Sequence, residues 1–493
     1  MLTAGWMLPA LVAAPAVLAG LSLLARTPRA ALWVGAVATT VIALVAGCAV
    51  AQVFMHGPLE CVGGWFFLDA LSAYHLAILM LVFVFCGFFA IVYFREEIAN
   101  GVFTRKLARR YQALWFGSFA AMNLVLVSNN LGVMWVGVEA TTLLSAFLIC
   151  IHVSPAALEA MWKYLLMCSV GVALAFAGIL LLAAASSASL SGHDALLWTR
   201  LMNPSVTLNP VLVKVAFIFL VVGFGTKAGL APLHSWLPDA HSQSPAPVSA
   251  MFSGFLLNTA LYCILRCLPI VEAATGNRGW GREILVVLGI LSILVAAVFI
   301  VAQHDVKRLL AYHSVEHLGI IALGVGLGGL GVWAALFHTL NHSVCKATSF
   351  FGAGMLGQTY GTHDMRRMTD VARVSPVWGT SLIGSLLALI GIAPFALFIS
   401  EFLILKAALN EKAYLAAALF LTGLGIVFIG ALGHAISMAW KPPATAPRPL
   451  RTHHAEALLA WTPLALLLLL GLWIPAPLRA LITQAAAVLG VTP

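Results

Sequence analysis

Several side chains that can carry a charge stand inside long apolar runs of this sequence. Glu139 lies within MWVGVEATTLLSAF, Lys227 within GFGTKAGLAPLHSWLPDAH, and Glu401 within FISEFLILK. A charged side chain at the centre of a bilayer costs about 3 kcal/mol even on a lenient insertion scale. Residues that carry such a cost are functional hypotheses by default, and the chemistry that these types share is the exchange of protons.

A second group of ionisable residues recurs at every fourth position. His338, His342 and Lys346 stand four apart within residues 331–357. Each step of four turns an α-helix by about 400°, so the three side chains lie on one face, over about 12 Å of height. An imidazole can accept a proton on one nitrogen and donate one from the other near neutral pH. The spacing therefore predicts a ladder of proton-exchanging groups along the membrane normal.

Each of these side chains also has a simpler interpretation. Two histidines four apart can bind a metal ion, although they need a third ligand and the neighbouring Lys346 disfavours a cation. The run LLAYHSVEHLGII holds His313, Glu316 and His317, and its histidines can be packing residues. The charged residues Glu139, Lys227 and Glu401 can simply tie helices together by ion pairs, although a buried ion pair barely recovers its desolvation cost. Lysines near the ends of apolar runs are expected to reach the headgroups: Lys163, Lys214 and Lys406.

The elements that must hold these residues are membrane-spanning helices. Of the 493 residues, 62% are hydrophobic and 9% are charged, whereas soluble domains carry about 25% charged residues. Apolar runs of roughly 20 residues recur along the chain, the length that spans the hydrocarbon core. Runs of this length satisfy their backbone hydrogen bonds as helices rather than as barrel strands. The composition predicts an all-α integral membrane protein and excludes a soluble one.

The eight cysteines argue against a redox centre of this chain's own. None of them forms a CxxC pair, and nearly all stand within apolar runs. Metal, cluster and disulfide frameworks need grouped cysteines, so these are expected to be small core residues. We therefore expect no cofactor and no metal site.

Apolar runs predict about fourteen transmembrane helices. The first, from Leu8 to Leu24, lacks a basic start and is expected to be a retained helix rather than a cleaved signal. The turn between the fourth and the fifth predicted helix is very short and consists of Ser128, Asn129 and Asn130. The expected spans are 5–24, 31–53, 68–94, 111–128, 130–151, 159–187, 208–236, 244–270, 284–303, 308–328, 331–357, 376–405, 413–440 and 456–485.

The lysines and arginines of the connecting segments are unevenly divided between the two sides. Alternate loops place fifteen of them on one side and five on the other. Basic loops stay in the cytoplasm, so the basic side is expected to be cytoplasmic and both termini to face outward.

Two of the expected helices contain breakers. The seventh, 208–236, holds Gly229 and Pro232, and the twelfth, 376–405, holds Gly391 and Pro394. Proline removes a backbone donor and clashes with the preceding turn, so both helices should be interrupted within the membrane. Interrupted helices at corresponding positions are typical of inverted repeats.

Because an odd number of helices inverts the second copy, we expect two inverted five-helix repeats. The chain would be a single membrane domain over 1–493. Its predicted parts are helices 1–3 over 1–110, repeat one over 111–270, repeat two over 283–440 and the last helix over 455–493.

The motif KAGLAPLHSWLPDAHSQSPAPVSA, residues 227–250, closely resembles the hallmark of a known family. That family comprises the antiporter-like subunits of respiratory complex I and of multisubunit sodium/proton antiporters. The similarity extends from Glu139 to Glu401. The run KRLLAYHSVEHLGII, residues 307–321, is most similar to the F subunit of hydrogenase-4-type membrane-bound hydrogenases. The resemblance implies a fourteen-helix core with helices 7 and 12 broken.

The resemblance also implies a proton channel within a larger complex. In the family pattern a glutamate, here Glu139, modulates a lysine, here Lys227, and Glu401 exchanges protons with the far side. One departure is Asn258, which stands where the family commonly has a lysine or histidine relay, so that link would need water or His234. The resulting path comprises Glu139, Lys227, His234, His338, His342, Lys346 and Glu401, with Glu316, His317 and Asn258 as secondary members.

The leading hypothesis is a proton-translocating subunit of a redox-driven assembly in a prokaryotic inner membrane. Its partners would be membrane and peripheral subunits of a nickel–iron hydrogenase or quinone-reductase complex, which would hold the redox chemistry. One alternative is a subunit of a cation/proton antiporter that moves sodium or potassium without redox chemistry. Another is an anchor or coupling subunit that conducts nothing, for example for an inorganic-carbon uptake protein. No nucleic-acid partner is expected.

Overall fold

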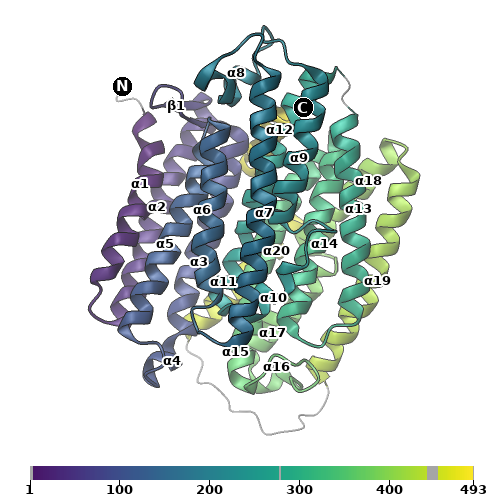
Figure 1. Ribbon diagram of the computed structural model, residues 1–493. Helices are drawn as coiled ribbons and strands as arrows, with labels where there is room; N and C mark the ends of the chain where they lie inside the picture. Colours follow the sequence, from purple (N-terminus) through teal and green to yellow (C-terminus); the bar gives the residue numbers. More distant parts are fainter. Residues whose placement is uncertain (1–3, 277–278, 441–453, 492–493) are drawn as a thin grey trace.

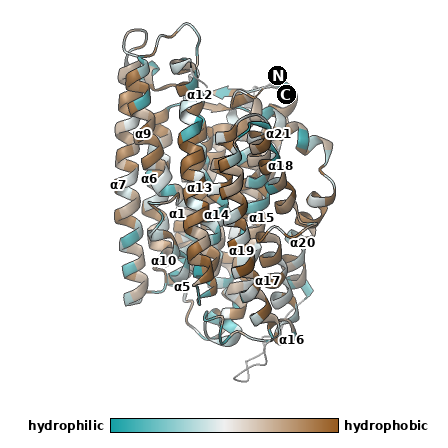
Figure 2. Cartoon of the chain, turned by 90° about the vertical axis from the view of Figure 1, so that its right-hand side faces the viewer, coloured by the Kyte–Doolittle hydropathy of each residue, from teal (hydrophilic) through white to brown (hydrophobic). Residues whose placement is uncertain are grey.

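The computed structural model describes residues 4–276, 279–440 and 454–491 as a mostly helical molecule (Figure 1). Eleven helical stretches in this part are long and apolar enough to cross a membrane. Apolar residues predominate along the helices in Figure 2. The expected class, an all-α integral membrane protein, is confirmed. The count of fourteen spans stays a prediction.

The N-terminal helices follow the predicted ranges, with one early start. Helix α5 begins at Arg105 rather than at 111, because the Thr104 side chain accepts a hydrogen bond from the Leu107 amide and caps it. The apolar run does not include this basic first turn, so the predicted helix started six residues too late. The elements here are η1 (Ala4–Trp6), α1 (Met7–Leu21), η2 (Ser22–Leu24), α2 (Pro28–His56), the antiparallel strands β1 (Leu59–Cys61) and β2 (Phe66–Leu68), α3 (Ala70–Tyr93), α4 (Arg95–Ala99) and α5 (Arg105–Val127).

The next helices contain two local features that bear on the site. The short turn after α5 is stabilised by Asn130, whose Oδ1 accepts from the amides of Gly132 and Val133 at 2.9 and 3.1 Å. The eighth predicted helix contains a π-helical turn, η4 (Phe252–Leu256), which was not expected. The elements are α6 (Leu131–Ile149), α7 (Pro155–Ala185), η3 (Gly192–Leu196), α8 (Trp198–Leu201), α9 (Pro210–Ala228), α10 (Trp236–Gln243), α11 (Ala246–Met251), η4 and α12 (Leu257–Thr275).

The remaining described helices complete the bundle. They are α13 (Trp280–Val301), α14 (Val306–Leu327), α15 (Gly329–Tyr360), α16 (Val371–Val374), α17 (Pro376–Leu389), α18 (Ala396–Asn410), α19 (Tyr414–Trp440), α20 (His454–Leu472) and α21 (Ala476–Val488). The last predicted helix, 456–485, is wrong as a single element. Helix α20 ends at Leu472 and α21 starts at Ala476, because Pro475 disfavours helical backbone at the residue before it.

Both predicted interruptions are present. Helix α9 ends at Ala228 before α10 starts, and α17 ends at Leu389 before α18 starts. Each break opens on a glycine with positive φ, Gly229 at 81° and Gly391 at 68°, a conformation that side chains with a Cβ rarely adopt. Each glycine is followed three residues later by the proline of a Gly-x-Ala-Pro sequence. The two breaks are alike, and the assignment of the chain to two inverted repeats stays a prediction.

The most polar long helices occupy the centre of the molecule. Helices α11, α12, α14 and α15 are buried along almost their whole length by their neighbours. Helices α1, α2, α19 and α20 bury mainly one side and expose apolar side chains on the other. A central helix needs no apolar face toward lipid, so α14 and α15 can hold the histidines, lysine and glutamate singled out above.

The two ends of the bundle differ in charge. Helix α1 starts at the end of the molecule that carries α8 and β1 (Figure 1), and α21 lies at the same end, near both termini (Figure 2). The opposite end carries α4, α16 and the basic start of α5. This arrangement agrees with an even number of spans, whereas the side of the membrane that each end faces stays a prediction.

Candidate functional site

Lys227, one of the predicted site residues, forms a hydrogen bond to a side chain of another helix. It stands in the last turn of α9, which Gly229 ends in left-handed conformation. A cation is favoured at the C-terminal end of a helix. The lysine is buried, donates a hydrogen bond to the Tyr164 hydroxyl of α7, and its Nζ lies 4.5 Å from the centre of that ring. Tyr164 in turn shares a hydrogen bond of 2.5 Å with Ser145 of α6.

Close packing of α7 against α9 makes this contact possible. A Cβ at Gly223 of α9 would lie 2.5 Å from the carbonyl oxygen of Gly171 and from the amide nitrogen of Ala175. Only a residue without a side chain lets the two backbones approach so closely. Tyr164 did not emerge from the sequence as a functional residue, because a tyrosine in an apolar run is unremarkable until its partner is known.

Glu139 of α6 contacts α7 as well, through a different residue. Its Oε1 accepts a hydrogen bond of 3.0 Å from Ser169 of α7, and its Oε2 has no partner among the described residues. Within that part of the chain, Glu139 and Lys227 form no ion pair. Helix α7 therefore contacts both residues, through Ser169 and Tyr164.

The predicted relay at His234 lies apart from the rest of the path. Its ring faces Phe299 and Tyr312, with centroids 6.4 and 6.2 Å away. Among the described residues it makes no hydrogen bond to Lys227 or Asn258. The structure does not bring this member of the predicted path together with the others.

A histidine that the sequence analysis passed over occupies a more central position. His241 of α10 is fully buried, and both of its ring nitrogens lack partners among the described residues. It stacks on Phe350 of α15, with ring centroids 5.0 Å apart, and the Lys346 ammonium lies 5.3 Å from the centre of the same ring. The signal was present, because His241 belongs to the motif that contains Lys227.

Asn258 contacts the second half of the chain directly. Its Nδ2 donates to Ser343 of α15 at 3.0 Å and to the Gly254 carbonyl at 3.2 Å. Within the π-helical turn, Ser253 shares a hydrogen bond of 2.7 Å with Ser314 of α14. Helical turns of this type recur at functional positions. The side chains that join η4 and α12 to α14 and α15 here are therefore hydroxyls and an amide, which do not titrate.

The ionisable residues of α14 and α15 form a nearly continuous buried line. His313 Nδ1 lies 2.8 Å from Glu316 Oε2, and His317 Nδ1 lies 2.9 Å from His338 Nε2. The centroid of the His342 ring lies 5.3 Å from that of His317. The ladder predicted on one helix is thus shared between two, because His338 and His342 both face His317.

Lys346 stands at one end of this line and Glu401 at the other. Lys346 donates a hydrogen bond to the Leu310 carbonyl of α14. At the far end, His338 Nδ1 lies 2.8 Å from the Ser400 hydroxyl of α18, the neighbour of Glu401. Glu401 is 6% exposed, and a Cβ at Gly391 would lie 2.3 Å from its Oε2.

Two triads could hold a metal ion within the part of the chain that the structure describes. In His313–Glu316–His317 and in His317–His338–Glu401, the candidate ligand atoms lie within 4.8 Å of one another. From the sequence, no metal site was expected, because the pair His338 and His342 lacked a third ligand, Lys346 stands beside it, and the cysteines are not grouped. The second triad combines residues from three helices, a grouping that spacing along one helix cannot reveal.

The family described as NADH:quinone oxidoreductase/Mrp antiporter, TM, matches residues 128–427. A hydrogenase-4 component F homolog from Methylacidiphilum infernorum is 37% identical over 372 residues, which cover 74% of this chain and 78% of that protein. Hydrogenase-4 component B of Escherichia coli is 30% identical over 368 residues, 72% of this chain and 52% of that protein, so the chain spans about half the length of this relative.

A solved structure shows the same fold. The Mrp complex from Dietzia sp. contains a chain with a TM-score of 0.84 and 23% identity, and the match covers 99% of this chain and 97% of that one. The resemblance inferred from the motif at residues 227–250 is confirmed. This protein belongs to the NADH:quinone oxidoreductase/Mrp antiporter family of antiporter-like membrane subunits.

Proposed function

We propose that this chain moves protons across the membrane along its buried Lys, Glu and His side chains, as a subunit of a redox-driven complex. The observation that carries the proposal is the line from Lys346 and His313 through His317 and His338 to Glu401. All these groups are buried. His313 and His317 are neighbouring rings, His317 is hydrogen-bonded to His338, and the side-chain atoms of His317, His338 and Glu401 lie within 4.8 Å of one another. Packing alone does not explain so many titrating groups in an apolar interior, because each costs desolvation energy.

The proposed route has two halves. The first holds Glu139 with Ser169, and Lys227 with Tyr164 and Ser145. A proton bound to Lys227 is held at the Tyr164 hydroxyl, which can accept one proton while donating its own to Ser145. Histidine suits the second half because each ring has one nitrogen to accept a proton and another to release it.

The junction between the halves lies near α10 and the π-helical turn. His241 bridges it by stacking on the ring that Lys346 also contacts. Asn258 and Ser343 supply further hydrogen-bonding groups. We therefore assign the linking role to His241, with Asn258 beside it, rather than to His234.

The redox chemistry would belong to partner subunits. A relative at 37% identity is named as a hydrogenase-4 component, and this chain's eight cysteines form no cluster motif. We propose a hydrogenase-4-like or complex I-like assembly with a nickel–iron hydrogenase or quinone-reductase partner. The alternative is a cation/proton antiporter without redox chemistry, which the shared fold of the Mrp complex favours. Purification of the native complex separates the two: a nickel–iron subunit supports the first, and only small membrane subunits support the second.

The translocation itself is tested in vesicles that contain the assembled complex. Lys227→Ala and Glu139→Ala should each abolish acidification, measured with a pH-sensitive dye, while the amount of assembled complex is unchanged. Lys214→Ala is the matched control, because Lys214 lies on the same helix with its ammonium 5.6 Å from the Trp280 ring. Wild-type pumping by both substituted complexes would disprove the assignment, and a silent Lys346→Ala would remove Lys346 from the route.

A further inference from the structure

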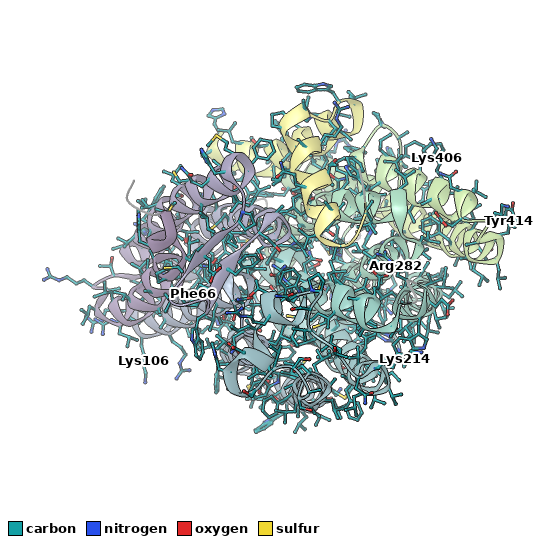
Figure 3. All side chains as sticks on the ribbon, turned by 90° about the horizontal axis from the view of Figure 1, so that it is seen from above. Phe66, Lys106, Lys214, Arg282, Lys406 and Tyr414 are labelled. Carbon is teal, nitrogen blue, oxygen red and sulfur yellow. The ribbon has the colours of Figure 1, made fainter. Side chains whose placement is uncertain are left out.

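A cavity of about 310 Å³ opens beside the break between α17 and α18. It lies between α18 and α19, and its walls include Phe398, Phe402, Phe420 and Phe428. Phe402 and Phe428 are exposed, so its mouth lies on the outer surface of the bundle. The two helices form one edge of the molecule in Figure 1. In Figure 3, which looks along the bundle from above, Lys406 of α18 and Tyr414 of α19 lie at the periphery of the molecule. The exposed side chains around this mouth are apolar, as expected of a surface that contacts acyl chains.

Glu401 is the one charged residue in the walls that the structure describes, and the other lining residues are apolar. Its carboxylate is nearly fully buried, and Oε1 has no partner among the described residues. Oε2 is held against Gly391, where a Cβ would lie 2.3 Å away. The cavity therefore combines one buried acceptor with aromatic and aliphatic walls.

A single carboxylate in apolar walls favours a ligand that is both cationic and apolar. A buried carboxylate is stabilised by a cation or a hydrogen-bond donor, and phenyl rings attract organic cations through their faces. Mg²⁺ and Ca²⁺ need six or more oxygen ligands, whereas the described lining side chains offer a single carboxylate. The histidines that form a triad with Glu401 do not line this cavity. An anion would meet the charge of Glu401. An apolar tail would fill the walls and leave the carboxylate without a partner.

We propose that the cavity binds a lipophilic ammonium ion that enters from the bilayer and places its nitrogen at Glu401. The apolar body then lies among the phenylalanines. The expected effect of binding rests on the proposed function. A cation bound at Glu401 would occupy the end of the proton route, so proton translocation would stop. The binding itself depends only on the cavity and the carboxylate.

The probe is 4-phenylbutylamine, with 4-phenyl-1-butanol as its neutral counterpart. Binding is measured on the full-length chain in nanodiscs, with empty nanodiscs subtracted. The amine should bind saturably and about tenfold more tightly than the alcohol, the effect expected of one charged hydrogen bond. Glu401→Gln should reduce this preference to none.

Two glycines of α19 give a matched pair of variants. Gly425 lines the cavity and Gly433 does not, and a Cβ at either meets no atom within 4 Å. Gly425→Leu should fill the cavity and weaken amine binding about tenfold or more, whereas Gly433→Leu should leave it unchanged. Equal affinity for amine and alcohol, or insensitivity to Gly425→Leu, would overturn the proposed site.

Translocation is followed separately in vesicles that contain the complex. The amine should inhibit the wild type and the Gly433→Leu complex, and should inhibit the Gly425→Leu complex much less. Saturable, charge-dependent binding without inhibition would count against the proposed function of Glu401 and leave the binding site standing. Failure of binding would overturn the site and leave the proton route to its own test.

Discussion

At the scale of single residues, the site depends on neutral partners as much as on titrating groups. Lys227 donates to Tyr164 rather than to a carboxylate, and Glu139 accepts from Ser169. Hydroxyl groups can accept and donate at once, so they connect charged groups without adding a further buried charge. Glu401 depends on a different neutral neighbour, Gly391, which leaves room for its carboxylate.

Tyr164→Phe removes the hydroxyl that links Lys227 to Ser145. We expect proton translocation to fall about tenfold, because a buried ammonium that loses its acceptor costs roughly 1–3 kcal/mol. The measurement is the initial rate of vesicle acidification at equal complex content. Tyr111→Phe is the control, since the Tyr111 hydroxyl is buried without a partner among the described residues. Equal rates for the two variants would show that the Tyr164 hydroxyl takes no part.

Gly391→Ala should displace the Glu401 carboxylate. The added methyl group would lie 2.3 Å from Oε2, and the alanine would have to adopt a φ of about 68°. Gly361→Ala separates the two effects, because Gly361 has a φ of 65° and open space around its Cβ position. We expect translocation to fall several-fold more in the first variant than in the second. The same loss in both would mean that backbone conformation, not contact with Glu401, is responsible.

At the scale of elements, interruptions place side chains where a continuous helix would not. The break after α9 ends the helix next to Lys227 and lets α10 bring His241 against α15. The break after α17 leaves the space in which Glu401 sits. The π-helical turn brings Ser253 within hydrogen-bonding distance of α14. Backbone irregularity is tolerated at membrane depth where it is surrounded by protein or lines a cavity. The π-helical turn is fully buried, and Ile390 and Gly391 at the second break line a cavity.

The segment α10 supplies a test of the junction. His241→Phe keeps the stacking on Phe350 and removes both ring nitrogens. We expect it to lower proton translocation about tenfold or more, by the loss of a group that accepts and releases protons. His234→Phe is the matched control in the same broken region, and its effect should be small. A strong loss in His234→Phe with none in His241→Phe would restore the relay expected from the sequence.

At the scale of the whole molecule, the polar helices are central and the apolar ones peripheral. The proposed route runs through α6, α7, α9, α10, α14, α15 and α18. Helices α14 and α15 are enclosed by their neighbours, whereas α6, α7 and α9 also expose apolar side chains on the outer surface. The basic first turns of α5 lie at the end that also carries α4 and α16, opposite the end where α1 starts (Figure 1).

The charge distribution makes a prediction about orientation. Alkaline phosphatase fused to the C terminus should be active, and green fluorescent protein fused there should be dim, because basic loops stay in the cytoplasm. Fusions at Asp370, near the basic end, should give the opposite pair of signals. Fluorescence at the C terminus together with phosphatase activity at Asp370 would reverse the expected topology.

Much of this architecture follows from the sequence because each feature has a local cause. The length of the apolar runs determines the helices, and Gly229, Pro232, Gly391 and Pro394 mark the two breaks that the structure contains. Burial of Lys227 and of the histidines of α15 follows from their place in such runs. The single C-terminal helix was wrong because the apolar run continues across Pro475 while the backbone does not.

Only the tertiary structure decides which residues meet. Helical spacing gives the face on which His338 and His342 lie, but not that His317 of α14 stands opposite them or that Ser400 of α18 binds His338. Tyr164 and His241 enter the site through contacts between helices that are far apart in the sequence. A tyrosine is common in apolar runs, so no local pattern marks Tyr164. His241 stands within the motif at residues 227–250, but the motif does not show which helix its ring contacts. Spacing within one helix determines the face on which each group lies, and packing between helices determines the order in which the groups are connected.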